Sequence, residues 1–487
     1  MVSGMRLTQR TELSAEKVPH EEPLLRVNGL RVSFVTRAGK IQAINDVSFE
    51  VKAGETFGLV GETGCGKSQT ALAVMRLTPE AGIIERGEIW LAGMNLTKNI
   101  SKEFKLIQKR SGRVNLKRNK SMLDRLSEEI NEIRGKDVSM IFQEPMTSLD
   151  PVYTVGMQVS ETLLRHGMNL LAGRIVARNA ATDEKLKEIV NAASREELSQ
   201  TQLHDMLQRN GLEALEDQIW FILSRKDVGA TQKVRMISNL PQRKAKPITL
   251  TFLSRLRKSN GEIPAEYRIL NKIPILRKWL IGALEDEALQ VSFELLSFVN
   301  MPNAESVLHQ YPHELSGGMR QRVMIAMALA TRPKLVIADE PTSALDVTVQ
   351  AQILELLRQL KRQFNSAVLF ISHDIGVISE ICDRVGVMYA GNLVEVARLD
   401  QLFTEAKHPY TQGLLASIPK YGEKRELLQT IEGTVPNLID PPKGCRFRTR
   451  CDRVFEKCSE GPPWLQLSEE HGVLCWLYGD SDKHVNQ

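Results

Sequence analysis

The chain has 487 residues, 42% of them hydrophobic and 25% charged, and its formal net charge is +5. These proportions are ordinary for a globular protein and exclude a collagen, a coiled coil and a wholly disordered chain. The small charge excess and the 5% aromatic content predict no general nucleic-acid surface, so no nucleic acid is expected as a partner. The sequence has neither an apolar run of about 18 residues nor an apolar signal core, so we expect no membrane-spanning helix and no export.

The apolar pattern along the chain predicts an α/β core. Residues 1–23 are polar and indicate a loose N-terminal arm. Val47, Phe49 and Val51 alternate with polar residues, which predicts a half-buried strand. Three later runs are short and continuously apolar, which is typical of strands buried on both faces of a parallel sheet; they are residues 138–142, 335–338 and 368–371. Helical patterns lie between them, as α/β folds require.

A glycine-rich loop follows a short apolar strand and precedes a helical pattern. It matches G-x-x-x-x-G-K-[ST] and consists of Gly61, Glu62, Thr63, Gly64, Cys65, Gly66, Lys67 and Ser68. Backbone N–H groups of such a loop wrap a triphosphate, and the following helix adds the positive end of its dipole. The pattern assigns Lys67 to the β- and γ-phosphates and the Ser68 hydroxyl to Mg²⁺. ATP and Mg²⁺ are therefore the predicted ligands.

Two acids, Asp339 and Glu340, end the apolar run at 335–338. A carboxylate at the C-terminal end of a strand lies where ligands bind in open α/β sheets. We expect Asp339 to hold Mg²⁺ through water and Glu340 to polarise the attacking water as a general base. The alternative is that both acids are solvated and merely precede a turn at Pro341. The phosphate loop makes this interpretation the weaker one.

Two segments stand apart from this core. Residues 98–135 carry eleven Lys or Arg against five acids. We expect a solvated helical hairpin there, and contact with anionic lipid head groups or with RNA is the alternative. Residues 169–286 are mostly helical in pattern, and the sequence assigns them no function.

An ordered set of motifs resembles the ABC-type ATPases. Residues 315–322 (LSGGMRQR) resemble the signature motif of that family, residues 343–346 (SALD) its D-loop, Gln143 its Q-loop and His373 its switch histidine. Phe34 stands where the family places an aromatic ring on adenine, and a core position is the alternative for it. Four segments narrow the resemblance to the ATPase subunits of peptide/oligopeptide and nickel importers; they are 143–151, 311–329, 345–353 and 408–419.

The resemblance implies a domain plan. An arm at 1–23 would precede an ATPase domain at 24–400, with a phosphate-loop sheet, an antiparallel β part and a helical subdomain. The segments 98–135 and 169–286 would be helical insertions in this domain. Residues 401–487 would form a small, cysteine-rich domain typical of the importer family.

The resemblance also implies roles for residues. Two ATPase subunits, identical or related, would pair head to tail, so that Ser316, Gly317 and Gly318 face the γ-phosphate held by the partner. His373 would contact the γ-phosphate, and Gln143 would sense Mg²⁺ and the attacking water. Catalysis would then depend on Glu340, His373 and Gln143.

Four cysteines lie near the C-terminus, at Cys445, Cys451, Cys458 and Cys475. Four thiolates within 31 residues can form one closed tetrahedral site. In the importer family, similar cysteines are associated with a [4Fe-4S] cluster, so the resemblance implies an iron–sulfur cluster here. A zinc site is one alternative, and unligated thiols or disulfides are the other.

The implied function is import. The chain would be a peripheral subunit at the cytoplasmic face of the membrane, hydrolysing ATP to drive peptides through two separate integral-membrane permease subunits. A solute-binding protein would take part indirectly, and nickel or oligosaccharides are alternative solutes. A soluble ABC-type ATPase acting on nucleic acid or ribosomes is the alternative function. Such proteins usually carry two ATPase units per chain, whereas this chain has one phosphate loop and one signature motif.

Overall fold

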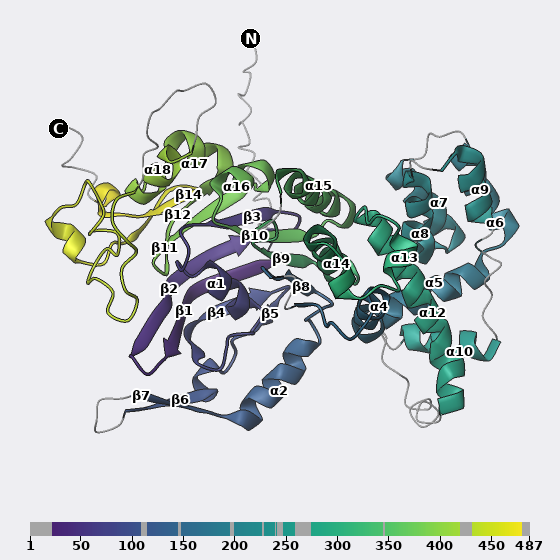
Figure 1. Ribbon diagram of the computed structural model, residues 1–487, viewed down its shortest axis with the longest axis horizontal. Coiled ribbons are helices and arrows are strands. Elements are labelled where there is room, and N and C mark those ends of the chain that lie inside the picture. The colour runs from purple at the N-terminus through teal and green to yellow at the C-terminus, as the bar shows by residue number, and fades with distance from the viewer. Residues whose placement is uncertain are drawn as a thin grey trace, which may run out of the picture.

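The computed structural model describes ten stretches of the chain, which are residues 22–108, 114–144, 148–194, 199–225, 228–238, 240, 247–258, 274–343, 346–418 and 431–479. A β-rich part lies on the left of Figure 1 and a helical lobe on the right. Most of the predicted arm, residues 1–21, lies outside the described residues. No helix in these stretches combines the length and apolar character that crossing a bilayer requires.

An eight-stranded sheet forms the centre of the β-rich part. Its order is β13-β14-β12-β11-β3-β10-β9-β8, and the pairs from β11 to β8 are parallel. Its strands are β3 (Thr56–Val60), β8 (Val138–Ile141), β9 (Leu335–Asp339), β10 (Ala367–Ser372), β11 (Arg384–Tyr389), β12 (Asn392–Arg398), β13 (Trp464–Ser468) and β14 (His471–Leu474). The three apolar runs named above are β8, β9 and β10, so their prediction as parallel strands is confirmed.

Alternate residues of these strands enter two different cores. In β9, Val336 and Ala338 pack in one core, and Leu335 and Ile337 pack in the other. Both faces are therefore covered, which explains why the strand sequences are continuously apolar. The helices that follow these strands or pack beside them are α1 (Lys67–Val74), α14 (Gly317–Leu329), α15 (Val347–Phe364), α16 (Ile375–Ile381), α17 (Leu399–Glu405) and α18 (Pro409–Ala416).

A four-stranded antiparallel sheet, in the order β2-β1-β4-β5, packs on one side of the main sheet. Its strands are β1 (Leu25–Val35), β2 (Lys40–Val51), β4 (Gly82–Leu91) and β5 (Met94–Asn95). Val47, Phe49 and Val51 are buried in β2 while their neighbours face outward, as their alternation predicts. Phe49 stacks on Phe57 of β3 with ring centroids 5.2 Å apart, which joins the two sheets.

The segment 98–135 is not the helical hairpin that we expected. It contains a β-hairpin of β6 (Phe104–Gln108) and β7 (Val114–Arg118), followed by one helix, α2 (Lys120–Asn131). Apolar and polar side chains alternate at Phe104, Lys105 and Leu106, which is typical of a strand. The many basic residues of the segment concealed this two-residue period. The residues between the two strands, 109–113, lie outside the described stretches.

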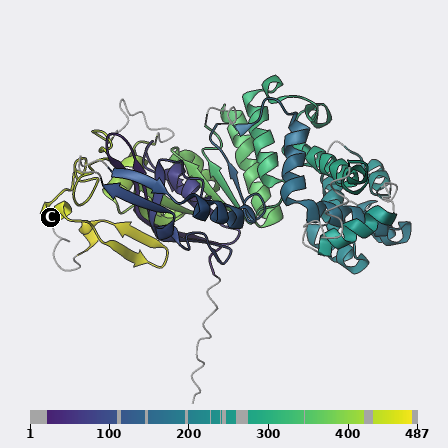
Figure 2. The same cartoon turned by 90° about the horizontal axis from the view of Figure 1, so that it is seen from below.

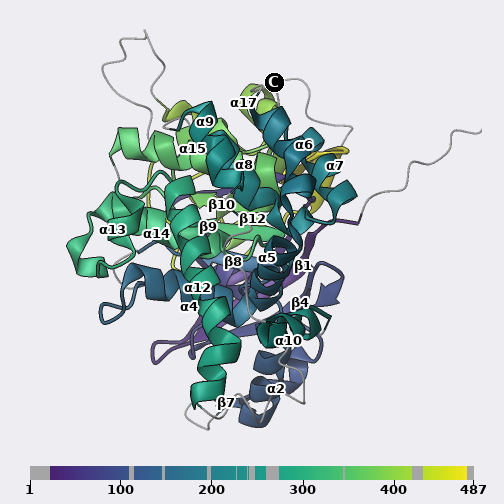
Figure 3. The same ribbon diagram turned by 90° about the vertical axis from the view of Figure 1, so that its right-hand side faces the viewer.

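The segment 169–286 is helical, as its pattern indicates. The lobe consists of α4 (Val155–His166), α5 (Met168–Ala180), α6 (Asp183–Ser194), α7 (Gln200–Asn210), α8 (Glu216–Ser224), α9 (Ala230–Ser238), α10 (Pro247–Lys258), α12 (Pro274–Phe298) and α13 (Ala304–Val307). It stands in front of the sheets in Figure 3. Buried ion pairs join α5 to α12: Arg174 Nη2 donates to the Glu294 carboxylate at 2.9 Å, and Arg178 binds both oxygens of Glu287 at 2.7 and 2.8 Å.

The C-terminal segment, which we expected to form a small cysteine-rich domain, adds strands to the main sheet. Strand β14 pairs with β12 and with β13, so the tail extends the main sheet. The buried Glu395 of β12 fastens it, because its carboxylate accepts from the backbone N–H groups of Lys407 and His408 and lies 2.8 Å from His471 Nε2. Seen from below in Figure 2, the yellow tail strands lie at the end of the molecule opposite the helical lobe.

Candidate active site

Four segments that are distant in sequence meet at one edge of the main sheet. The strands β3, β10, β9 and β8 are parallel neighbours, so their C-terminal ends lie side by side. The phosphate loop follows β3, His373 follows β10, Glu340 follows β9, and Gln143 comes just after β8. This is the edge at which open α/β sheets bind ligands.

The phosphate loop requires glycine at specific positions. Gly64 and Gly66 have φ values of 80° and 107°, which favour glycine. A Cβ atom on Gly61 would lie 2.1 Å from the Met388 carbonyl oxygen, a distance that no side chain tolerates. Lys67 is buried, and its Nζ donates to the carbonyl oxygens of Gly61 and Glu62 at 2.7 and 3.2 Å. A cation is thus held inside the loop, where the predicted phosphates would lie.

Ser68 and Asp339 form a polar pair beside the loop. The Ser68 hydroxyl donates to Asp339 Oδ1 at 3.0 Å. Burial raises the pKa of Asp339 to about 6, and the hydrogen bond from Ser68 opposes this shift. A hydroxyl and a carboxylate are oxygen ligands suited to Mg²⁺, and a divalent cation would relieve the burial of this carboxylate.

Glu340 lies between the other two predicted catalytic residues. Gln143 Nε2 donates to Glu340 Oε2 at 3.0 Å, and His373 Nδ1 lies 3.2 Å from Glu340 Oε1. The Glu340 side chain is 12% exposed and its backbone φ is 46°, in the left-handed region that non-glycine residues seldom occupy. Its backbone N–H donates to the Ile371 carbonyl of β10 at 2.9 Å, which fixes this conformation.

Two residues that the sequence did not single out hold the phosphate loop from the C-terminal side. The backbone N–H of Glu62 donates to the Tyr410 hydroxyl at 2.9 Å. The Glu62 carboxylate accepts two hydrogen bonds from Arg450, at 2.9 and 3.2 Å. Arg450 is 5% exposed and also lies over the Tyr389 ring. Only the segment around Tyr410 resembled a known family, and no sequence pattern marks Arg450.

The signature residues lie apart from this constellation. Ser316 caps α14 by accepting from the Met319 N–H at 3.3 Å, and Gly317 has open space around its α-carbon. In the described stretches, no hydrogen bond or ion pair joins residues 316–318 to the phosphate loop. Of the D-loop, residues 344–345 lie outside the described residues, whereas Asp346 caps α15 through the Val349 N–H. Phe34 is half-buried in β1 and packs against Gly82, which is compatible with either interpretation of it.

The four tail cysteines converge on one cavity, which His408 and Phe447 also line. Burial raises the pKa of Cys445 and Cys451, and that of Cys475 to about 12. The cavity measures about 10 Å³, room for about one water-sized group. Across the described ranges, no group of three or more His, Cys, Asp or Glu side chains is arranged to hold a metal ion. The donor atoms suit a thiolate site, but this conformation has no room for a cluster.

Comparison with known proteins identifies the family. A model described as "ABC transporter" matches residues 44–240 and 216–343, and one described as "Oligopeptide/dipeptide transporter, C-terminal region" matches 394–458. The oligopeptide transport ATP-binding protein OppD of Salmonella typhimurium is 35% identical over 93% of this chain and 93% of its own length. The dipeptide transport ATP-binding protein DppD of Bacillus subtilis is 32% identical, with 95% and 97% covered. The chain belongs to the ABC transporter ATPases.

Within this family, the chain also has the C-terminal region that is described for oligopeptide/dipeptide transporters. Its fold is the α/β fold of an ABC ATPase, and it binds and hydrolyses ATP. Among solved structures, the dimeric cassette MJ0796 matches with a TM-score of 0.42 and 16% identity, covering 77% of this chain and 98% of that one.

Proposed function

We propose that the chain is the ATP-hydrolysing subunit of a peptide importer, acting with separate membrane permease subunits. The observation that carries the proposal is the combination of the assembled edge site with a C-terminal region of the oligopeptide/dipeptide type at 394–458. The OppD proteins of Salmonella typhimurium and Bacillus subtilis are oligopeptide transport proteins by name, at 35% and 34% identity. A peripheral position at the cytoplasmic face of the membrane follows from this role.

The geometry supports a specific division of labour at the site. Lys67 neutralises the β- and γ-phosphates, and Ser68 with Asp339 holds Mg²⁺, which supplies charge neutralisation when bound. Glu340 accepts the proton of the water that attacks the γ-phosphorus. His373 and Gln143 orient the Glu340 carboxylate and the attacking water, because each lies within 3.2 Å of one carboxylate oxygen.

The signature residues act on a partner subunit in this proposal. Ser316, Gly317 and Gly318 open helix α14, whose first N–H groups and positive dipole end suit a phosphate. They have no hydrogen bond to the loop of their own chain in the described residues. Two ATPase subunits, identical or related, would therefore complete two sites together.

Uptake measurements test the import function. Cells lacking this chain should lose uptake of a tritium-labelled tripeptide and regain it with the wild-type chain but not with Glu340→Gln. Radioactive nickel and a labelled trisaccharide serve as controls for the alternative solutes. Unchanged tripeptide uptake in the deletion strain would refute peptide import, and loss of nickel or trisaccharide uptake would reassign the solute.

We further propose that the four tail cysteines ligate a [4Fe-4S] cluster, with the cavity opening to admit it. The convergence of four thiols supports this, while the small cavity weighs against it. Protein purified without oxygen should contain about four iron and four sulfide per chain, and Cys451→Ser should lose both. ATP binding should persist in that variant. One zinc without iron would replace the cluster by a zinc site, and absence of both metals would leave unligated thiols.

A further inference from the structure

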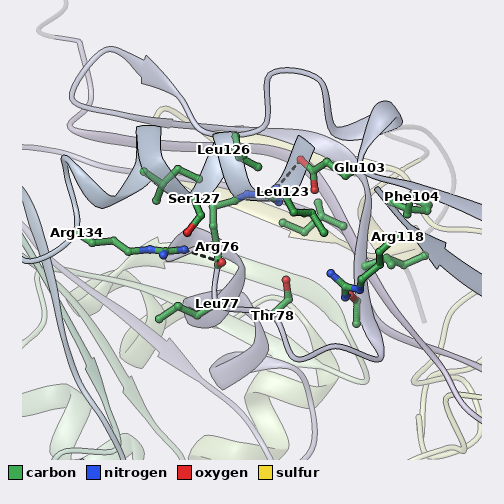
Figure 4. A pocket seen from close by; sticks show the side chains of 14 residues that line it. Arg76, Leu77, Thr78, Glu103, Phe104, Arg118, Leu123, Leu126, Ser127 and Arg134 are labelled. Atoms are coloured by element: carbon green, nitrogen blue, oxygen red, sulfur yellow. Dashed lines mark hydrogen bonds and ion pairs between the residues drawn. The ribbon is translucent and has the colours of Figure 1, made fainter. Parts of the chain in front are cut away.

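A cavity of about 370 Å³ lies between the end of α1 and the segment 98–135. It shares no residue with the phosphate loop, because it begins where α1 ends, at Arg76 and Leu77. Figure 4 shows α2 along one side, with Leu123, Leu126 and Ser127 directed inward. Its volume is within the usual range for small-molecule sites.

Three arginines line the cavity, and within the described stretches only Arg76 pairs with an acid. Arg76 pairs with Glu103 at 2.5 Å, and both side chains are less than 10% exposed. Arg118 donates to the carbonyl oxygens of Pro79, Glu80 and Gly82. Figure 4 places Arg134 and Arg118 at opposite ends, with Arg76 between them.

Among the residues that the structure describes, Arg134 is likewise bound to neutral oxygens. It donates to the carbonyl oxygens of Met75 and Arg76 and to the Asn131 side chain. Burial lowers the pKa of Arg134, and the charge of Arg76 lowers it further. Three cations against one carboxylate leave the cavity with a net positive charge.

One donor in the cavity wall also lacks a partner. Arg76 Nε is buried and makes no hydrogen bond within the described part of the chain. Its side chain is 6% exposed, so water has little access to it. A buried guanidinium N–H without an acceptor is costly, so negative charge bound beside the Arg76 guanidinium would stabilise it.

Most of the remaining wall is apolar, and Thr78 and Ser127 are its polar side chains. Ile83 and Ile84 of β4 and Ile130 of α2 are each no more than 3% exposed, whereas Leu77 is 38% exposed at the rim. A small inorganic anion would leave this surface unused. A ligand that has an anionic head and an apolar body would contact both parts of the wall.

We propose that this cavity binds a small amphipathic anion, a phosphate or carboxylate attached to an apolar chain or ring. Arginine forks recognise both head groups through paired N–H donors. The head group lies between Arg76 and Arg118, and the apolar body lies along α2 and β4. A lipid head group or a free metabolite could offer this chemistry, and the experiment separates the two.

Calorimetric titration of the full chain with octyl phosphate, kept below its micelle concentration, tests the proposal. We expect saturable binding of one molecule per chain. Arg118→Gln should weaken it at least about tenfold, since a hydrogen bond to a charged group is lost. Arg125→Gln, at an exposed position of α2, is the matched control and should bind as the wild type does.

A second variant keeps the test independent of the hairpin that Arg118 helps to fix. Ser127→Phe fills the cavity without removing a cation, so it should abolish binding while ATPase activity stays unchanged. Inorganic phosphate and octanol should each bind more weakly than octyl phosphate. Vesicles containing phosphatidylglycerol test whether the ligand is a lipid. If the wild-type chain binds these vesicles and Arg118→Gln and Ser127→Phe do not, the head group belongs to a lipid.

Three results would overturn the proposal. They are an absence of saturable binding of octyl phosphate, inorganic phosphate that binds as tightly as octyl phosphate, and a loss of binding in Arg125→Gln as large as that in Arg118→Gln. The last result would indicate general attraction to a basic surface instead of a site.

Discussion

Replacing Arg450 by glutamine should weaken ATP binding, although Arg450 lies 388 positions from its partner Glu62 in the phosphate loop. Arg450 donates two hydrogen bonds to the Glu62 carboxylate. Glu62 in turn accepts from Lys67 through its carbonyl oxygen and donates to Tyr410 through its N–H. Arg450 therefore fixes the loop conformation before the nucleotide arrives, and Arg450→Gln removes this constraint.

The size of the effect follows from burial. Hydrogen bonds to charged groups contribute about 1.5–3 kcal/mol. Arg450 is 5% exposed but Glu62 is 28% exposed, so water replaces part of the loss at the carboxylate. We therefore take the lower end, about 1.5 kcal/mol for the pair, which corresponds to about a tenfold increase in the Kd of ATP if the whole loss falls on loop order.

The assay is titration of the full chain with a fluorescent ATP analogue and Mg²⁺, arranged as a double-mutant cycle. Arg450→Gln and Glu62→Gln should each raise the Kd, and the double variant should resemble either single one, because the pair is lost only once. Arg450→Lys keeps the charge but not the two-pronged geometry and should be intermediate. Lys443→Gln, an exposed residue of the same segment, should bind normally. A Kd within about twofold of the wild type for Arg450→Gln, or strictly additive effects, would refute the reasoning.

Three further outcomes test the site. Glu340→Gln should bind ATP but hydrolyse it at least about tenfold more slowly, since a general base contributes about 10²–10⁴-fold to the rate. Lys67→Ala should instead weaken ATP binding itself. Single-turnover kinetics and binding measurements distinguish the two effects. Asp339→Asn should stabilise the nucleotide-free chain by up to about 3 kcal/mol at pH 8, because a carboxyl pKa raised to about 6 destabilises the folded state above that pH. This gain in stability should shrink as the pH falls from about 6 towards 4. A gain in thermal stability that does not depend on pH would contradict this cause. The isolated chain should be a poor ATPase whose specific activity rises with protein concentration or with a related subunit, because the proposed arrangement has Ser316 act on a partner's nucleotide; full activity in a demonstrably monomeric sample would contradict that arrangement.

Local chemistry made several features readable from the sequence alone. The glycines and Lys67 of the phosphate loop form one short segment, so their role depends on neighbours within a few residues. The strands β8, β9 and β10 were recognisable because burial on both faces leaves no room for polar alternation. Asp339 and Glu340 could be placed because they end such a strand.

Tertiary structure decided what depends on pairing between distant segments. Gln143, Glu340 and His373 come together only because β8, β9 and β10 are adjacent and parallel, an order that no local pattern encodes. The basic residues of 98–135 concealed a two-residue period, so the β-hairpin was mistaken for helices. The tail joined the main sheet because β14 pairs with β12, and Arg450 reached Glu62 through that placement. Sequence fixes which side chains are available, whereas long-range strand pairing determines which of them meet.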